Sequence, residues 1–204
     1  TRNTFIPVDA FGSININSQL TFSRTHILGV DMATSIGGFG LWAEAAAFIP
    51  DKNVIMTNDF SAFYPASPVP VTIDSLLLDS SEPYVRFVLG GDYNFSDGSY
   101  VNFQYMHGFI NERGQGNLND YFFARYEKKF FNEKLKIAPI GGGFIVTDWN
   151  NIKDNYTILF VPEIAYQATD NVEMSLSAAI IDGKGSGVFS NLNNFDMLMF
   201  KLKY

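Results

Sequence analysis

Apolar and polar residues alternate one by one in the segment TILFVPEIAYQATDNVEMSLS, residues 157–177. Ile158 and Phe160 share one parity with the later apolar residues, whereas Glu163 falls on the other. Side chains of a strand point to opposite faces in turn, so this pattern predicts a strand with one apolar and one mixed face. Thr169-Asp170-Asn171 has a tight-turn composition, and the alternation resumes after it. The segment is therefore predicted to form a β-hairpin.

The same pattern recurs along most of the chain and predicts nine strands. Each of them exceeds the usual strand length of about 5–6 residues in globular proteins. A length of about 9–11 residues suits a tilted strand that crosses a lipid bilayer. The predicted strands are 22–36, 39–49, 84–95, 100–110, 119–131, 134–147, 156–168, 172–182 and 194–204.

The connections between these strands alternate between short and long. The short ones have turn compositions, such as Gly37-Gly38 and Ser96-Asp97-Gly98. The long ones are polar or glycine-rich, and residues 50–83 form the longest. Short turns on one side and long loops on the other are typical of outer-membrane barrels, and we expect residues 50–83 to be an extracellular loop.

Two fold classes fit an alternating pattern: a soluble β-sandwich, with its apolar face in the core, and a membrane barrel, with that face against lipid. The sorted loop lengths favour the barrel. So do aromatic residues near predicted strand ends, among them Tyr93, Phe95 and Tyr100, since aromatic rings gather at membrane interfaces. We therefore predict an all-β fold: a transmembrane antiparallel up-and-down β-barrel that occupies residues 1–204 as a single domain.

Composition narrows the function classes. Only 17% of residues are charged, against about a quarter in soluble domains. The net charge of −7 argues against nucleic acid as a partner. The absence of cysteine excludes disulfides and thiolate metal sites.

The last strand, FDMLMFKLKY, resembles the terminal strand of Gram-negative outer-membrane β-barrels of the porin type. The hairpin GGDYNFSDGSYVNFQYMHGF is similar to porin-like families of proteobacteria. The resemblance implies location in the Gram-negative outer membrane, contact with its lipid and lipopolysaccharide, and recognition by the barrel-assembly machinery. It also implies an assembly signal made by Leu198, Phe200, Leu202 and Tyr204.

Strand parity bears on the size of the barrel. If the tight turns are periplasmic, the first and last of nine strands both run inward, and such a set does not close as an even-numbered barrel. Either residues 1–21 supply a tenth strand, or the chain is the C-terminal part of a longer barrel. The weak pattern of residues 1–21, which contain Pro7, favours the longer barrel.

The mixed faces of the predicted strands are candidates for the wall of a pore. Acidic residues gather on the early strands and basic residues on later ones, so a transverse field that filters charged solutes is one hypothesis. Ion pairing within the wall is the alternative. The predicted pore-lining residues are Asp31, Glu44, Arg86, Asp92, Asn102, Gln104, Arg125, Glu127, Lys129, Lys136, Glu163, Glu173 and Lys201.

These features predict a channel for passive diffusion of small hydrophilic solutes, anionic ones among them, with no cofactor. A plugged or partner-binding structural barrel is the main alternative, and the sequence leaves homo-oligomers and hetero-complexes open. An enzyme is not expected, because neither His26 nor His107 has an evident catalytic partner and metal-ligand spacings are missing.

Two local features carry further expectations. Pro139 and Pro162 fall at similar heights on neighbouring predicted strands, next to Gly141-Gly142-Gly143, which predicts a bulge or bend. Leu76, Leu77 and Leu78 would be exposed at a loop tip. They are expected to fold into the mouth of the pore or to pack on a neighbouring loop or protomer.

Overall fold

The computed structural model describes residues 1–8, 12–22, 24–51, 53–78, 82–185, 187, 189–193 and 195–204. The chain divides into two compact units, residues 1–28, 47–85 and 113–117 in one and residues 29–46, 86–112 and 118–204 in the other. The expectation for Leu76, Leu77 and Leu78 concerns side chains outside this description.

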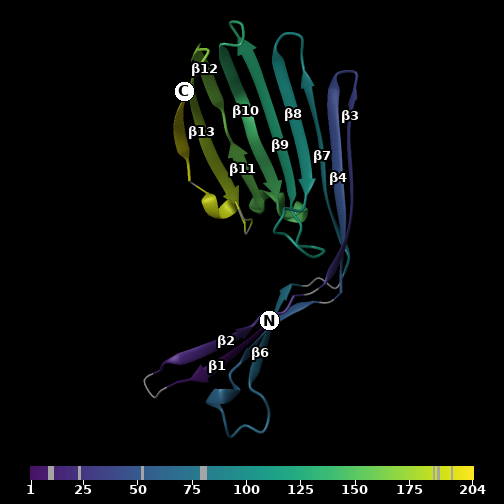
Figure 1. The fold of residues 1–204 in the computed structure, drawn as a ribbon, viewed down its shortest axis with the longest axis vertical. Coiled ribbons are helices and arrows are strands. Elements are labelled where there is room, and N and C mark those ends of the chain that lie inside the picture. The colour runs from purple at the N-terminus through teal and green to yellow at the C-terminus, as the bar shows by residue number, and fades with distance from the viewer. Residues whose placement is uncertain are drawn as a thin grey trace. The chain divides into compact units, whose positions relative to one another are not determined.

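A ten-stranded sheet dominates the second unit (Figure 1). Its strands follow one another in space in the order β3-β4-β7-β8-β9-β10, then β12 and β11 side by side with β10, then β13 and β14. The pairings from β7 to β14 are antiparallel. The strands are β3 (Thr25–Ile36), β4 (Phe39–Pro50), β7 (Tyr84–Asn94), β8 (Ser99–His107), β9 (Asp120–Phe130), β10 (Leu135–Val146), β11 (Tyr156–Phe160), β12 (Glu163–Thr169), β13 (Val172–Lys184) and β14 (Met197–Lys203).

Tight turns join neighbouring strands at one end of this sheet, and the longer connections lie at the other end (Figure 1). Gly37 and Gly38 have φ values of 58° and 86°, which permit the two-residue turn between β3 and β4. Phe131, Asn132 and Glu133 adopt the same left-handed region between β9 and β10. The predicted all-β class and the large antiparallel sheet are confirmed.

The predicted bend around Pro139 and Pro162 is confirmed. The register between β9 and β10 shifts between Ile137 and Ile140, and the single predicted strand 156–168 is split into β11 and β12. Gly142 has a φ of 134°, and a Cβ there would lie 1.9 Å from the carbonyl oxygen of Leu159. The two backbones approach so closely at this point that only glycine fits.

The small unit contains a second sheet of four strands in the order β2-β1-β5-β6. Its strands are β1 (Arg2–Pro7), β2 (Ile14–Gln19), β5 (Val54–Asp59) and β6 (Thr72–Leu78). The pairing of β1 with β5 is parallel, whereas the other two are antiparallel. Residues 50–83, predicted as a long extracellular loop, thus contain β5 and β6, and the weakly patterned residues 1–21 contain β1 and β2.

Three short 3₁₀ helices complete the described structure: η1 (Ser61–Phe63), η2 (Trp149–Asp154) and η3 (Ser190–Leu192). None of the described helices is long and apolar enough to span a membrane.

Buried side chains in the large sheet lie mainly on its polar face. Ala138, Ala165 and Ala179 are almost fully covered there, and so is Thr157. Large apolar residues on the opposite face are instead well exposed. Crowding of small residues on one face is expected where a sheet curves toward that face, as barrel walls do.

Candidate functional site

The registers place the predicted pore-lining residues of β7 to β14 on a common face, which we call the polar face. Asp92 pairs with Asn102 and Asn102 with Arg125, so these three form one cross-strand row. Strand alternation then puts the remaining residues on the same side. The set is Arg86, Asp92, Asn102, Gln104, Arg125, Glu127, Lys129, Lys136, Glu163, Glu173 and Lys201.

Glu163 is the centre of an ion-pair network on the polar face. Its carboxylate lies 2.9 Å from Lys136 Nζ and 3.7 Å from Arg125 Nη2. Arg125 Nε also lies 3.0 Å from Glu127 Oε2. Two bases thus meet two acids on the central strands, so these charges largely neutralise one another.

The hypothesis of a basic arc on the central strands is weakened by this arrangement. Lys129 pairs directly with Lys136 across the ladder, as the turn position predicts, but Lys129 Nζ lies 3.0 Å from the carboxylate of Glu133. Ion pairing within the wall, the alternative interpretation of the sequence, accounts for the central charges.

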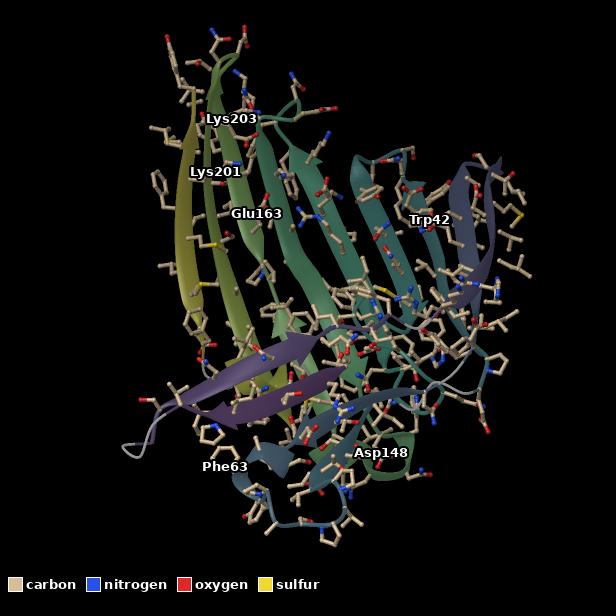
Figure 2. All side chains as sticks on the ribbon, turned by 60° about the horizontal axis from the view of Figure 1, so that its bottom comes forward. Trp42, Phe63, Asp148, Glu163, Lys201 and Lys203 are labelled. Carbon is tan, nitrogen blue, oxygen red and sulfur yellow. The ribbon has the colours of Figure 1, made fainter. Side chains whose placement is uncertain are left out.

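Basic residues line the β14 edge, where Lys203 is the direct cross-strand partner of Glu173. Lys201 and Lys203 point to the polar face beside Ser175 and Glu173 of β13, and Figure 2 shows them along this edge. Within the described residues, neither lysine has its Nζ within 4.0 Å of a carboxylate oxygen.

The other edge of the sheet, at β3 and β4, also carries charged residues on the polar face, and these are acidic. Asp31 on β3 and Glu44 on β4 line a shallow hollow of about 640 Å³ together with Arg86. Neither carboxylate takes part in an ion pair within the part of the chain that the structure describes. Arg86 donates hydrogen bonds to the backbone oxygens of Phe109 and Ile110, which fixes the loop at the rim of the hollow.

Glycines let bulky groups lie flat on the polar face near this hollow. A Cβ on Gly90 would lie 2.2 Å from the ring of Trp42, which Figure 2 labels on β4. A Cβ on Gly40 would lie 2.3 Å from a carboxylate oxygen of Asp92. The glycines therefore determine where these side chains rest, which the sequence pattern alone does not reveal.

The opposite face of the large sheet, which we call the apolar face, is broadly exposed. Val30 of β3 is 73% exposed, Phe103 of β8 50% and Phe200 of β14 68%. The exposed apolar side chains span the sheet from one edge to the other and include Leu28, Val30, Met32, Leu41, Val85, Leu89, Phe103, Ile140, Ile158, Phe160, Ile164, Tyr166, Leu176, Ile180, Leu198, Phe200 and Leu202. Exposed apolar areas on soluble monomers rarely exceed a few hundred Å².

The predicted assembly signal lies on this face of the edge strand β14. Leu198 pairs with Ala178, Phe200 with Leu176 and Leu202 with Met174. Tyr204 follows the strand and is 99% exposed.

A polar cluster that the sequence did not predict lies at the loop end of the apolar face. Asp120 accepts hydrogen bonds from Tyr105 Oη at 2.6 Å and from the indole of Trp149, and its carboxylate lies 2.8 Å from His107 Nδ1. The ring of Phe122 stacks on that of Tyr105 at 4.9 Å and meets that of Trp149 edge-on. This cluster fixes η2 to the sheet and places amphipathic rings at a strand end.

Each histidine contacts an aspartate within the described part of the chain. His26 lies 3.6 Å from Asp51, and His107 contacts Asp120 and the ring of Phe87. No serine hydroxyl is among these described partners. The residues that the structure describes also contain no group of three or more His, Asp or Glu side chains able to hold a metal ion.

Comparison with models of known families, with curated proteins and with solved structures finds no match to this chain. The geometry of the two faces is therefore the basis for inferring a function.

Proposed function

We propose that the chain forms part of the wall of a β-barrel in the outer membrane of a Gram-negative cell, and that the barrel is a channel for passive diffusion of small hydrophilic solutes. The observation that carries this proposal is the exposed apolar face, which runs from β3 to β14. Hydrocarbon covers such a face without a partner protein, since lipid-facing and lumen-facing residues alternate in membrane barrels. The lipid and lipopolysaccharide of the membrane would be the partners of this face.

The lumen would be lined by the polar face. Amides such as Asn102 and Gln104 and the paired charges around Glu163 keep water favourable there without a strong net field at the centre. The charges that remain for selectivity are those at the two edges, with Asp31 and Glu44 on one side and Lys201 and Lys203 on the other. Anionic solutes would be attracted along the lysines.

Planar-bilayer recording tests the proposal. Protein refolded in detergent is expected to give stepwise, stable conductance, and silence at all protein concentrations would contradict the channel. In the double variant Asp31→Asn/Glu44→Gln, the reversal potential in a salt gradient should move toward anion selectivity, because two acids leave the wall. The matched control Asp74→Asn, in the four-stranded sheet, should leave the reversal potential unchanged.

A structural or partner-bound barrel is the second candidate. The observation in its favour is the neutralised network of Arg125, Lys136 and Glu163, which suits a wall packed against other groups. Folding that requires detergent or lipid, together with silent bilayers, would favour this candidate over the channel.

A further inference from the structure

The two edges of the ten-stranded sheet have the same direction. β3 runs from the loop end to the tight turn at Gly37-Gly38. β14 is antiparallel to β13, which leaves the turn at Thr169–Val172, so β14 also runs toward the tight-turn end. A direct seam between β3 and β14 would therefore be parallel, whereas the pairings from β7 to β14 are antiparallel.

The strand count leads to the same requirement. β11 and β12 share one position, because both pair with β10 and with β13, so the ten strands fill nine positions. Antiparallel closure needs an even total, which means that the space between the two edges takes an odd number of strands. In hydrocarbon, open edges are costly because each unpaired N–H and C=O lacks water.

Charge indicates what the neighbouring strands carry. The β14 edge presents Lys201 and Lys203 on the polar face, and the β3 edge presents Asp31 on the same face. Opposite charges on paired strands stabilise a sheet and like charges destabilise it. A strand beside β14 should therefore be acidic on this face, and a strand beside β3 should be basic.

A second copy of the chain fits these edges poorly. An upright copy brings its β3 beside β14 in a parallel seam. An inverted copy gives antiparallel seams, but it pairs β14 with β14, which offers the lysines no acidic partner, and β3 with β3, which offers Asp31 no basic partner. The upright copy therefore fails the requirement for antiparallel pairing, and the inverted copy fails the requirement for opposite charges.

We propose that the β3 and β14 edges are both strand-addition sites for a different polypeptide segment with an odd number of strands, antiparallel to both edges, acidic toward Lys201 and Lys203 and basic toward Asp31. The segment would alternate apolar residues on the apolar face with these polar ones on the other, and main-chain hydrogen bonds would supply most of its affinity. The proposal rests on the barrel of the proposed function, but not on an open pore.

Disulfide trapping with synthetic peptides tests this, since the chain contains no cysteine. Ala33→Cys on β3 and Met199→Cys on β14 each receive peptides about ten residues long, the length of one tilted strand. The peptides alternate Leu with Thr and carry either two Glu or two Lys on the Thr face. Each is made with its cysteine near the N-terminus or near the C-terminus. Ser175→Cys on the interior strand β13 is the matched control.

Met199→Cys should trap the Glu peptide about fivefold more than the Lys peptide, and Ala33→Cys should show the reverse preference. Met199 lies near the start of β14, so the antiparallel peptide must carry its cysteine near its C-terminus, whereas Ala33 should select the N-terminal cysteine. Ser175→Cys should trap neither peptide.

A disulfide between the two cysteines of Ala33→Cys/Met199→Cys, within or between copies, would overturn the proposal, and so would trapping with no preference for charge or direction. If the protein traps the peptides as expected but gives no conductance in bilayers, only the proposed channel is refuted. Conductance steps without selective trapping would refute only the strand-addition sites.

Discussion

The two sheets of this chain are built from similar residues but present them differently. The large sheet has strands of up to 13 residues and separates an exposed apolar face from a polar one. The small sheet has strands of six or seven residues, and polar side chains link its strands, as in the hydrogen bonds between Asn3, Asn58 and Ser18. Strand length and the separation of the two faces therefore distinguish the large sheet from the small one, and both are features of strands in membrane barrels.

An arginine on the apolar face should give the largest difference between the two sheets. Leu176→Arg places a charge where we propose hydrocarbon, and its cost should be about 2–4 kcal/mol if the site lies near the bilayer midplane. Ile16→Arg, at an exposed apolar position of β2, should cost about 0.5 kcal/mol. Denaturant unfolding in lipid vesicles measures both losses of unfolding free energy. Equal losses would show that the two sheets do not differ in what surrounds their apolar residues.

A methyl group at the bend should have the next largest effect. Gly142→Ala forces a Cβ toward the Leu159 carbonyl oxygen at a left-handed φ, so unfolding free energy should fall by about 3 kcal/mol. Gly12→Ala, beside the small sheet, has a φ of 93° but open space around it, and should lose about 1 kcal/mol. A loss at Gly142 no larger than at Gly12 would show that the close approach of the backbones does not exist.

Removal of the central carboxylate should have a smaller effect. Glu163→Gln leaves Lys136 and Arg125 without their shared partner, and we expect a loss of about 1 kcal/mol, since the side chain of Glu163 is partly exposed. Glu133→Gln removes a single, more exposed pair with Lys129 and should cost about 0.3 kcal/mol. High salt should reduce the first loss less than the second, and a reversed order would contradict the network.

Acid should remove a stabilising contribution from one turn of each sheet. Hydrogen bonds from Lys128 and Ser99 lower the pKa of Asp97 to about 2, and those from Ser61 and Arg2 lower the pKa of Asp59 to about 2. Because both values lie below the ordinary value of 3.8, the stabilisation is complete above about pH 4 and is lost as pH falls through about 2.

Tryptophan fluorescence separates these two contributions, because both tryptophans belong to the unit of the large sheet. Asp97→Asn should flatten the fluorescence change between pH 4 and pH 2, whereas Asp59→Asn should leave it unchanged. An equal response to both variants would mean that the two units unfold together.

Sequence reasoning predicted the large sheet well and missed the small one, for physical reasons. Alternation with period two locates the strands, and the tight turns determine which residues pair, as for Lys129 and Lys136. The small sheet joins β1 to β5 in parallel across more than fifty residues, and its short strands lack a pure apolar face. No local pattern encodes such a pairing.

The sequence predicted which charged residues share the polar face, but not which of them pair with one another. Alternation placed the charged residues on one face, yet the pairing of Glu163 with both Arg125 and Lys136 depends on the register shift in β10. The contact of Asp120 with Trp149 joins residues 29 apart in sequence, and only the folded loop η2 brings them together.

The positions of Trp42 and Trp149 give the unmodified protein one intrinsic fluorophore for each face of its large sheet. Trp42 rests on Gly90 on the polar face, while Trp149 is tethered to Asp120 beside the aromatic rings of the apolar face. Brominated acyl chains should therefore quench Trp149 selectively, and aqueous iodide should quench Trp42. The emission of the unmodified protein would thus report which face of the sheet contacts lipid and which contacts water.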